Sequence, residues 1–109
     1  MNNNEEKALS YISLAAKAGK LVSGSFMVEK SIVEGTSFLV IIASDASENT
    51  HKKFTNKCKF YNVPCVSFSD SDTLGHRIGK QSRITVSVTE QGLAKQVMSR
   101  LCSIEDMEV

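Results

Sequence analysis

The sequence has no tryptophan, a single proline and no long apolar segment. Its longest apolar run, residues 38–43, covers six residues, whereas a helix that crosses a bilayer needs ~20. Residues 1–6 lack the basic start and apolar middle of a secretory signal. These absences predict a cytoplasmic protein without a membrane partner.

Cysteine and histidine are scarce, and their spacing is not that of a metal or catalytic site. Cys58, Cys65 and Cys102 form no Cys-x-x-Cys pair, so reduced and mostly buried thiols are expected instead of a disulfide framework or a zinc site. His51 lies on an apolar helical stripe, and His76 has no carboxylate nearby in the sequence to orient it as a base. We therefore expect no metal, no cofactor and no catalytic residue.

A phosphate-binding P-loop is also absent. Such a loop needs four residues between its glycines and a serine or threonine directly after its lysine. Here three residues separate Gly75 from Gly79, and Gln81 follows Lys80. The sequence thus predicts a protein that is not an enzyme and has no small-molecule substrate.

The charge is unevenly distributed along the chain. Hydrophobic residues make up 41% and charged residues 23% of the 109 residues, as in ordinary folded domains. Five of the 12 acids lie at the two ends, which leaves 13 lysines and arginines against seven acids in residues 7–104. This part of the chain therefore carries +6, which suits an anionic partner.

Helices and strands alternate in the predicted secondary structure. Apolar, β-branched runs predict strands at residues 21–22, 38–43, 65–68 and 84–88, of which 38–43 should be buried on both faces. Helical periodicity surrounds them, with only a short helical turn at residues 69–73. The expected helix caps are Asn3 with Glu6, then Ser25, then either Asp45 with Glu48 or Ser47 alone, and finally Thr89.

This order predicts an α/β fold in a single domain over residues 1–109. Helices should cover both faces of a mixed sheet of about four strands, giving a three-layer α/β/α sandwich. In such sheets ligands bind at the loops that leave the carboxyl ends of strands. Those loops are expected at residues 23–25, 44–49, 69–72 and 88–90.

A glycine-rich, basic loop before the last strand is one candidate binding element. It joins apolar Leu74 and Ile78 to flexible glycines and to the cations Arg77 and Lys80, with Arg83 following. This composition suits packing on an unstacked base while the charges meet phosphate. The alternative is an ordinary connection whose two apolar residues fill the core.

The turn before the second predicted helix is the other candidate. Ser23, Gly24 and Ser25 precede a helix N-terminus, which is a natural seat for an anion, although helix capping explains the pattern as well. Lys30, one turn further, is either close enough to meet a phosphate or a solvated lysine. The lysines of residues 52–59 leave the same choice open.

Five short motifs spread over nearly the whole chain carry a family resemblance. They are Ala18-Gly19-Lys20-Leu-Val-Ser-Gly24, Ser44-Asp45-Ala-Ser-Glu-Asn49-Thr50, Lys57-Cys58, Val63-Pro64 and Leu74-Gly-His-Arg-Ile-Gly79-Lys80. In order and spacing they closely resemble the bacterial YlxQ-type proteins, within the family of ribosomal proteins that bind kink-turn RNA. The resemblance implies the same three-layer sandwich.

The resemblance also implies noncatalytic binding of kink-turn RNA, or of a similarly kinked structured RNA. In that family the loop and helix start after the first strand contact tandem sheared G·A pairs, and a second, largely apolar loop covers an extruded base. The RNA-binding residues implied here are Lys20, Ser23, Gly24, Ser25, Phe26, Met27, Lys30, Asp45, Leu74, Gly75, His76, Arg77, Ile78, Gly79 and Lys80. Lys20, Lys30, Arg77 and Lys80 are expected on phosphates. Ribosomal RNA and an mRNA leader are the candidate targets, and a monomer associated with the ribosome or with translation is expected.

Two adjacent positions depart from the family pattern. Archaeal members read Gly-Thr-Asn-Glu-x-x-Lys where this chain has Phe26 and Met27 in place of the Asn-Glu pair. Those side chains cannot make hydrogen bonds to base edges. An alternative function is therefore a protein–protein interaction module on the same fold, in which Phe26 and Met27 form an apolar contact patch.

Overall fold

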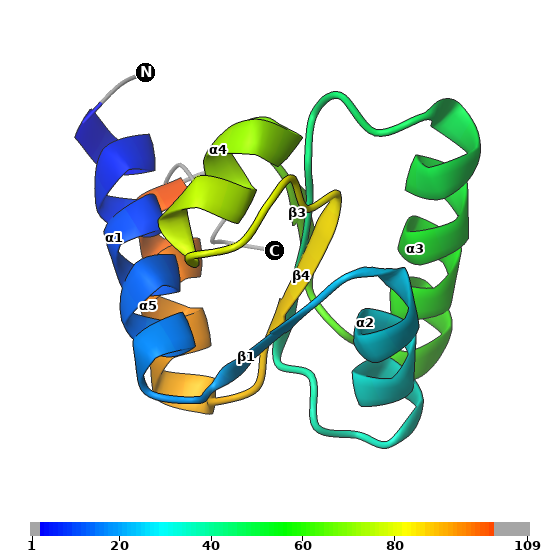
Figure 1. Ribbon diagram of the computed structural model, residues 1–109. Coiled ribbons are helices and arrows are strands. Elements are labelled where there is room, and N and C mark those ends of the chain that lie inside the picture. Colours follow the sequence, from blue (N-terminus) through cyan, green and yellow to red (C-terminus); the bar gives the residue numbers. More distant parts are fainter. Residues whose placement is uncertain (1–2, 102–109) are drawn as a thin grey trace.

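The computed structural model describes residues 3–101, so Cys102 and the acidic residues at 105–108 lie outside the described part (Figure 1). Five helices and four strands alternate along the chain. They are α1 (Asn3–Lys17), β1 (Leu21–Ser23), α2 (Ser25–Val33), β2 (Leu39–Ile42), α3 (Glu48–Tyr61), β3 (Cys65–Ser67), α4 (Ser71–Arg77), β4 (Thr85–Val88) and α5 (Gln91–Leu101). No helix within residues 3–101 is both long and apolar enough to cross a membrane.

The four strands form one mixed sheet in the order β1-β4-β2-β3. β2 and β3 are parallel, whereas β4 runs antiparallel to both of its neighbours, β1 and β2. Helices α1, α4 and α5 cover one face of the sheet, and α2 and α3 cover the other (Figure 1). The predicted three-layer α/β/α architecture is confirmed.

Strand β2 supplies the centre of both hydrophobic cores, as its apolar run predicted. Leu39 and Ile41 belong to the core under α1 and α5, while Val40 and Ile42 belong to the core under α2 and α3. All four side chains are buried. Successive residues of a strand point to opposite faces, so a strand covered on both sides must be apolar throughout.

Strand β4 is covered on both faces although it alternates polar and apolar residues. Val86 and Val88 lie in the core under α1 and α5. Thr85 and Ser87 point the other way and are also fully buried. The Ser87 hydroxyl is hydrogen-bonded to the hydroxyls of Ser31, at 3.0 Å, and Ser37, at 2.6 Å, so this buried polar group is satisfied.

Several of the predicted helix caps are wrong in position. Helix α2 begins at Ser25 itself, so the capping residue is Gly24, and no side chain caps this helix. Helix α5 is capped by Glu90 rather than Thr89, because the Glu90 carboxylate accepts the N–H groups of residues 92 and 93 at 2.7 and 2.8 Å.

Of the other two helices with an expected capping residue, only α3 has its capping position within the described residues. Ser47, one of the two alternatives, caps α3 by accepting the N–H of Thr50 at 3.2 Å. Helix α1 already contains Asn3, so its capping position lies outside the described residues.

Helix α4 is longer than the short turn predicted at residues 69–73, and it absorbs half of the predicted loop. Asp70 caps its start by accepting the Thr73 N–H at 2.8 Å. Gly79, with a φ of 74°, ends it, and the Lys80 N–H then bonds back to the Gly75 carbonyl at 2.8 Å. Leu74 is therefore a fully buried helix residue, and the loop begins only at Ile78.

The returning loop passes directly over Gly75. A Cβ atom at this position would collide with the Gln81 carbonyl group and approach the Ser82 nitrogen to 2.9 Å. Glycine is thus required here by close backbone packing, because the loop can lie against α4 only where no side chain intervenes.

We expect Gly75→Ala to lower the free energy of unfolding by about 1–3 kcal/mol, as overpacking of a close contact does. Urea denaturation followed by circular dichroism measures the loss. Gly92→Ala is the control for replacing a helical glycine, since a Cβ there would meet the Glu90 carboxylate, at 3.2 and 3.3 Å, and no backbone atom. Equal stability of the two variants would contradict the requirement for glycine at position 75.

Candidate functional site

Four connections meet at one edge of the sheet. β1, β2 and β3 end there, and antiparallel β4 begins there. Backbone hydrogen bonds join the connections: Gly24 N–H to the Thr85 carbonyl at 3.0 Å, and Ser44 N–H to the Ser69 carbonyl at 2.8 Å. The loops at residues 23–25, 44–47, 68–70 and 78–84 therefore form one continuous surface, here called the loop edge.

Two predicted elements lie at the opposite edge of the sheet. The expected ligand loop at residues 88–90 follows β4, whose antiparallel direction carries it away from the loop edge. Lys20 is also there, because its carbonyl accepts the N–H of Thr89 at 2.9 Å. The structure therefore separates Lys20 from the other predicted binding residues.

The start of α2 presents free backbone donors at the loop edge. Gly24 has a φ of 89° and a ψ of 150°, which turns the chain sharply from β1 into the helix. The Val28 N–H bonds to the Gly24 carbonyl, whereas the N–H groups of Ser25, Phe26 and Met27 have no acceptor within residues 3–101. Such a helix N-terminus favours an anion.

The outer face of α2 is apolar at its start and basic one turn later. Phe26 is 76% exposed and Met27 is 41% exposed. Lys30 is exposed and has no ion-pair partner within the described chain. Phe26 and Lys30 line the same shallow groove, between α2 and Lys57 of α3.

The lysines of α3 are mostly paired. Lys53 and Lys57 both contact the Glu29 carboxylate, at 2.8 and 3.6 Å, and Lys52 contacts Glu48 at 3.5 Å. The hydrogen bond from Lys53, followed by the charges of both lysines, lowers the pKa of Glu29. Of the two interpretations left open for this run, the contacts favour a solvated helix face whose charge is partly neutralised by Glu29 and Glu48.

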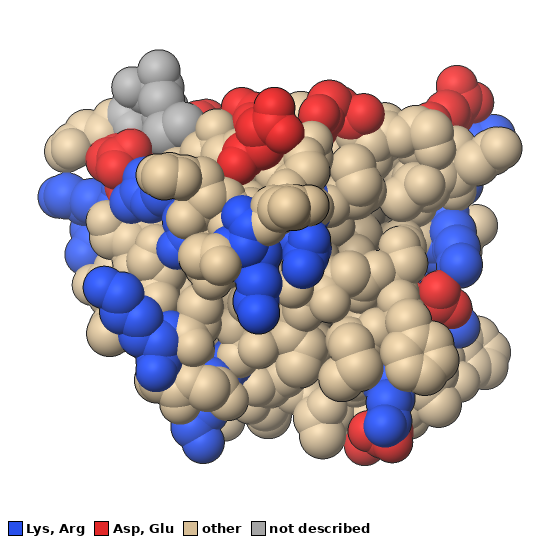
Figure 2. All heavy atoms as spheres, in the orientation of Figure 1, with Lys and Arg blue, Asp and Glu red and all other residues tan. Residues whose placement is uncertain are grey.

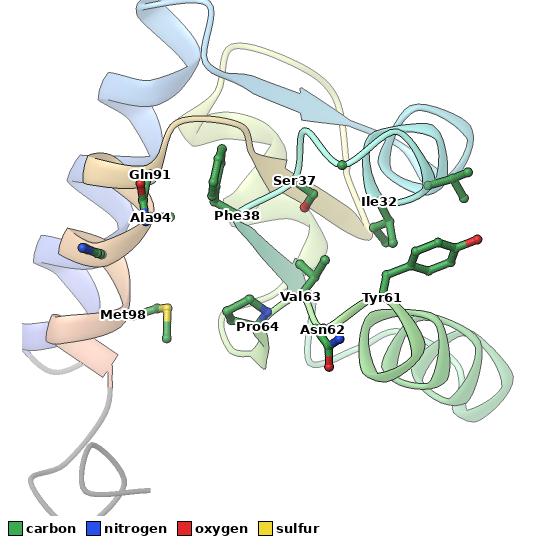
Figure 3. Close-up of a pocket in the computed structure, with 13 residues that line it drawn as sticks. Ile32, Ser37, Phe38, Tyr61, Asn62, Val63, Pro64, Gln91, Ala94 and Met98 are labelled. Atoms are coloured by element: carbon green, nitrogen blue, oxygen red, sulfur yellow. The ribbon is translucent and has the colours of Figure 1, made fainter.

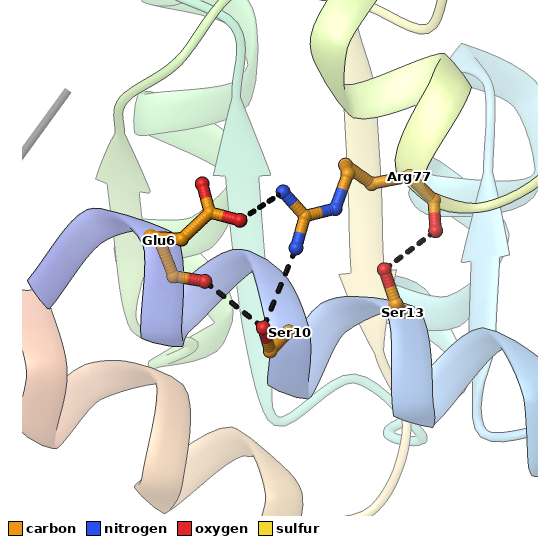
Figure 4. A network of polar contacts seen from close by, with 4 residues as sticks. All are labelled: Glu6, Ser10, Ser13 and Arg77. Carbon is orange, nitrogen blue, oxygen red and sulfur yellow. Dashed lines mark hydrogen bonds and ion pairs between the residues drawn. The ribbon is translucent and has the colours of Figure 1, made fainter. Parts of the chain in front are cut away.

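Arg77 points away from the loop edge. Its Nη1 lies 2.7 Å from the Glu6 carboxylate, and its Nη2 donates to the Ser10 hydroxyl at 3.4 Å (Figure 4). The Ser13 hydroxyl in turn donates to the Arg77 carbonyl at 2.7 Å. These contacts join the end of α4 to α1 and neutralise the charge that the sequence assigned to a phosphate.

The other predicted residues of the second element divide between core and surface. Leu74 and Gly75 are buried, so the alternative interpretation of Leu74 as a core residue is correct. Ile78 is half-buried against the same core. His76, Gly79 and Lys80 are exposed.

Asp45 joins two of the loops at the edge. It does not cap α3; its carboxylate accepts the N–H and the hydroxyl of Ser71, at 2.9 and 2.7 Å. The hydroxyl hydrogen bond first, and then the N–H hydrogen bond, hold the pKa of Asp45 below its ordinary value. The loop after β2 is thereby fixed to the start of α4.

Arg83 is at the centre of the loop edge, although sequence analysis left it outside the predicted site. Its backbone N–H donates to the Ser71 carbonyl at 3.0 Å, and its Nε donates to the Ser23 hydroxyl at 3.1 Å. The only signal in the sequence is that Arg83 is a third cation close to Gly79, after Arg77 and Lys80. Its position depends on a contact 60 residues away along the chain.

Lys and Arg side chains lie in several groups on the face around α4 (Figure 2). Lys and Arg side chains gather over α1 and over the middle of the view, where α4 and the connection to β4 lie in Figure 1 (Figure 2). Several acidic side chains line the upper rim of the same face. The middle of this face therefore suits a polyanion.

An apolar hollow of about 520 Å³ lies at the other end of the sheet (Figure 3). The ends of α2 and α3 form one side, and Ala94 and Met98 of α5 form the other. Phe38 and Tyr61 line it and are partly exposed, and Lys95 is the one charged residue among its described lining residues. Its chemistry differs from that of the loop edge.

The described cysteines are largely withdrawn from solvent. Cys58 is buried, and its hydrogen bond with Cys65 together with its burial raises the pKa of its thiol. Cys65 is half-buried at the start of β3. Within residues 3–101 no group of three or more histidine, cysteine, aspartate or glutamate side chains could hold a metal ion.

Comparison with known proteins places these features in a family context. The pattern of the ribosomal protein L7Ae/L30e/S12e/Gadd45 family matches residues 6–98. The RNA-binding protein YlxQ of Bacillus subtilis is 43% identical over 90 residues, which cover 83% of this chain and 90% of that protein. The large ribosomal subunit protein eL8 of Thermoplasma volcanium is 30% identical over 90% of this chain and 82% of its own length. A solved structure of a Bacillus halodurans protein of unknown function has a TM-score of 0.84 at 35% identity, covering 87% of this chain and 96% of that one.

We expect Asp45→Asn to be less stable than wild type at pH 7, and this difference to shrink as the pH falls below about 4. The lowered pKa means that the unfolded chain binds the proton first, so the stabilisation is present above the unfolded pKa and is lost as pH falls through the folded one. Urea denaturation at pH 7, 5, 4 and 3 measures it, with Glu34→Gln as a control for loss of an exposed acid. A pH-independent difference between wild type and Asp45→Asn would contradict this account.

Proposed function

The chain belongs to the ribosomal protein L7Ae/L30e/S12e/Gadd45 family, and from this premise we propose that it is a noncatalytic RNA-binding protein that recognises kink-turn or similarly kinked structured RNA. The observation that carries the proposal is the loop edge, where the uncapped start of α2 lies beside the loop at residues 78–84. A relative that is 43% identical bears the name RNA-binding protein.

The start of α2 is the proposed seat of the RNA backbone. The N–H groups of Ser25, Phe26 and Met27 offer hydrogen bonds to phosphate oxygens, and the helix dipole adds a favourable field. Lys30, which has no described ion-pair partner, adds a cation one turn along the same helix. Backbone contacts of this kind position an RNA by its shape and carry no base sequence.

The loop after α4 is the proposed cover of an extruded base. Leu74 cannot act as the apolar tip that the sequence suggested, because it is fully buried. Half-buried Ile78 and exposed Gly79 instead offer an apolar surface, and exposed Lys80 supplies a charge beside it. An unstacked base packs well on such a surface while its phosphate meets the lysine.

Phe26 and Met27 limit the hydrogen bonds that the proposed site can make to bases. Neither side chain can form hydrogen bonds to the edges of G·A pairs, so recognition rests on Ser25, the backbone and the shape of the RNA. The exposed Phe26 ring offers a stacking surface for an unpaired base. We also propose that the protein is a cytoplasmic monomer that acts with the ribosome or with an mRNA leader.

A second candidate function is a protein–protein interaction module. The observation that favours it is the exposure of Phe26 and Met27, at 76% and 41%, on a helix face where the family pattern has polar residues. Its signature would be a protein partner that survives nuclease treatment, together with no preference for kinked RNA.

We expect a kink-turn duplex to bind at least tenfold more tightly than the same duplex with its G·A pairs changed to Watson–Crick pairs. The reason is that the loop edge is rigid and fits an RNA that is already bent, whereas the straight duplex must be deformed. Gel-shift titration at fixed salt measures both affinities. Equal binding would refute specific recognition and favour the protein-interaction function.

We expect Lys30→Ala to weaken binding and to reduce the slope of log affinity against log salt by about 0.7–0.9, the value for one lost phosphate contact. Filter binding between 50 and 300 mM KCl measures the slope. Lys95→Ala is the matched control, since this exposed lysine lines the apolar hollow at the other end of the sheet. An unchanged slope in Lys30→Ala would remove Lys30 from the site.

A further inference from the structure

Arg83 links the two proposed RNA-binding elements and keeps part of its guanidinium free. Its Nε donates to Ser23, on the turn before α2, at 3.1 Å. Its Nη1 donates to the carbonyls of Gln81 and Ser82, in the loop before β4, at 3.4 and 3.0 Å. Its Nη2 donates to no atom within residues 3–101 and is not buried. This group therefore lies open at the junction of the two loops.

The charge of Arg83 is not neutralised. No carboxylate of the described chain lies within 4.0 Å of it, and all of its acceptors are uncharged oxygens. Arg77, six residues earlier, has an ion pair with Glu6 at 2.7 Å. A half-buried guanidinium held only by neutral groups retains its attraction for an anion, whereas a paired one has lost most of it.

We propose that Arg83 binds a phosphate of the RNA at the junction of the turn before α2 and the loop before β4, and that Arg77 makes no such contact. This inference rests on the proposed function and adds a residue to its site. The contact uses the free Nη2 edge, while Nε and Nη1 hold the guanidinium in place.

Only arginine can make this set of contacts. Its planar guanidinium directs donors to several sides at once, so it can hold Ser23 and the loop carbonyls and still present N–H groups to phosphate. A lysine ammonium is a point charge on a flexible stem. Lysine at position 83 would therefore keep the charge and lose the fixed geometry.

The test is filter binding of the full chain to the kink-turn duplex between 50 and 300 mM KCl, for wild type and four variants. Arg83→Ala should bind at least tenfold more weakly at the lowest salt, because a charged hydrogen bond is lost. Its slope of log affinity against log salt should be smaller by about 0.7–0.9. Arg83→Gln should show the same loss of slope although its amide can still donate to Ser23. Arg83→Lys should keep the wild-type slope at lower affinity. Arg77→Ala should match wild type in slope.

The outcomes separate a phosphate contact from a structural role. Thermal midpoints measured in parallel identify any variant that fails to fold, and Arg83→Gln then carries the test if Arg83→Ala does fail. If Arg83→Ala and Arg83→Gln keep the wild-type slope of log affinity against log salt, while wild type still prefers the kinked RNA, the Arg83 contact alone is overturned. Equal wild-type binding to the kinked and Watson–Crick duplexes would overturn the proposed function, and absence of any RNA binding would overturn both.

Discussion

The direction of β4 is the constraint on which the loop edge depends. β4 lies between β1 and β2 and runs antiparallel to both, so it begins where its neighbours end. The loop at residues 78–84 is thereby brought beside the turn at Gly24, 60 residues away along the chain. A parallel β4 would have placed that loop at the opposite edge, with Lys20. The loop edge therefore results first from the topology of the sheet and then from its side-chain contacts.

Polar contacts then fix the distance between the loops. The hydrophobic cores position the sheet and helices, but they are non-directional and do not set how neighbouring loops lie. Asp45 fixes the start of α4 through two hydrogen bonds to Ser71, and Arg83 connects the same Ser71 to Ser23. Gly75 allows the loop before β4 to pass close over α4. A pre-formed surface of this kind loses little conformational entropy on binding, which favours a ligand of fixed shape.

Features that depend on neighbours in the chain can be predicted from the sequence. The alternation of elements and the buried strand at residues 38–43 follow from local periodicity and composition, and both are confirmed. The residues of β4 do not indicate whether the strand runs parallel or antiparallel to its neighbours. The sequence therefore predicts the loop at residues 88–90 at the wrong edge of the sheet. The two arginines show the same limit, because each is a cation near Gly79 in the sequence. Their long-range contacts differ, because Arg77 pairs with Glu6 and Arg83 donates to Ser23, which are 71 and 60 residues distant.

Phe26 and Met27 are consistent with the proposal that the loop edge recognises an RNA by its shape. The surrounding donors are mostly backbone N–H groups and long cations, which are groups that can contact phosphate without distinguishing bases. Phe26 and Met27 are exposed, and neither side chain caps α2. Both residues therefore shape the surface at the start of α2. Under the proposed function, a change at this helical turn would alter the contacts made to bases, while the backbone donors of the loop edge would stay the same.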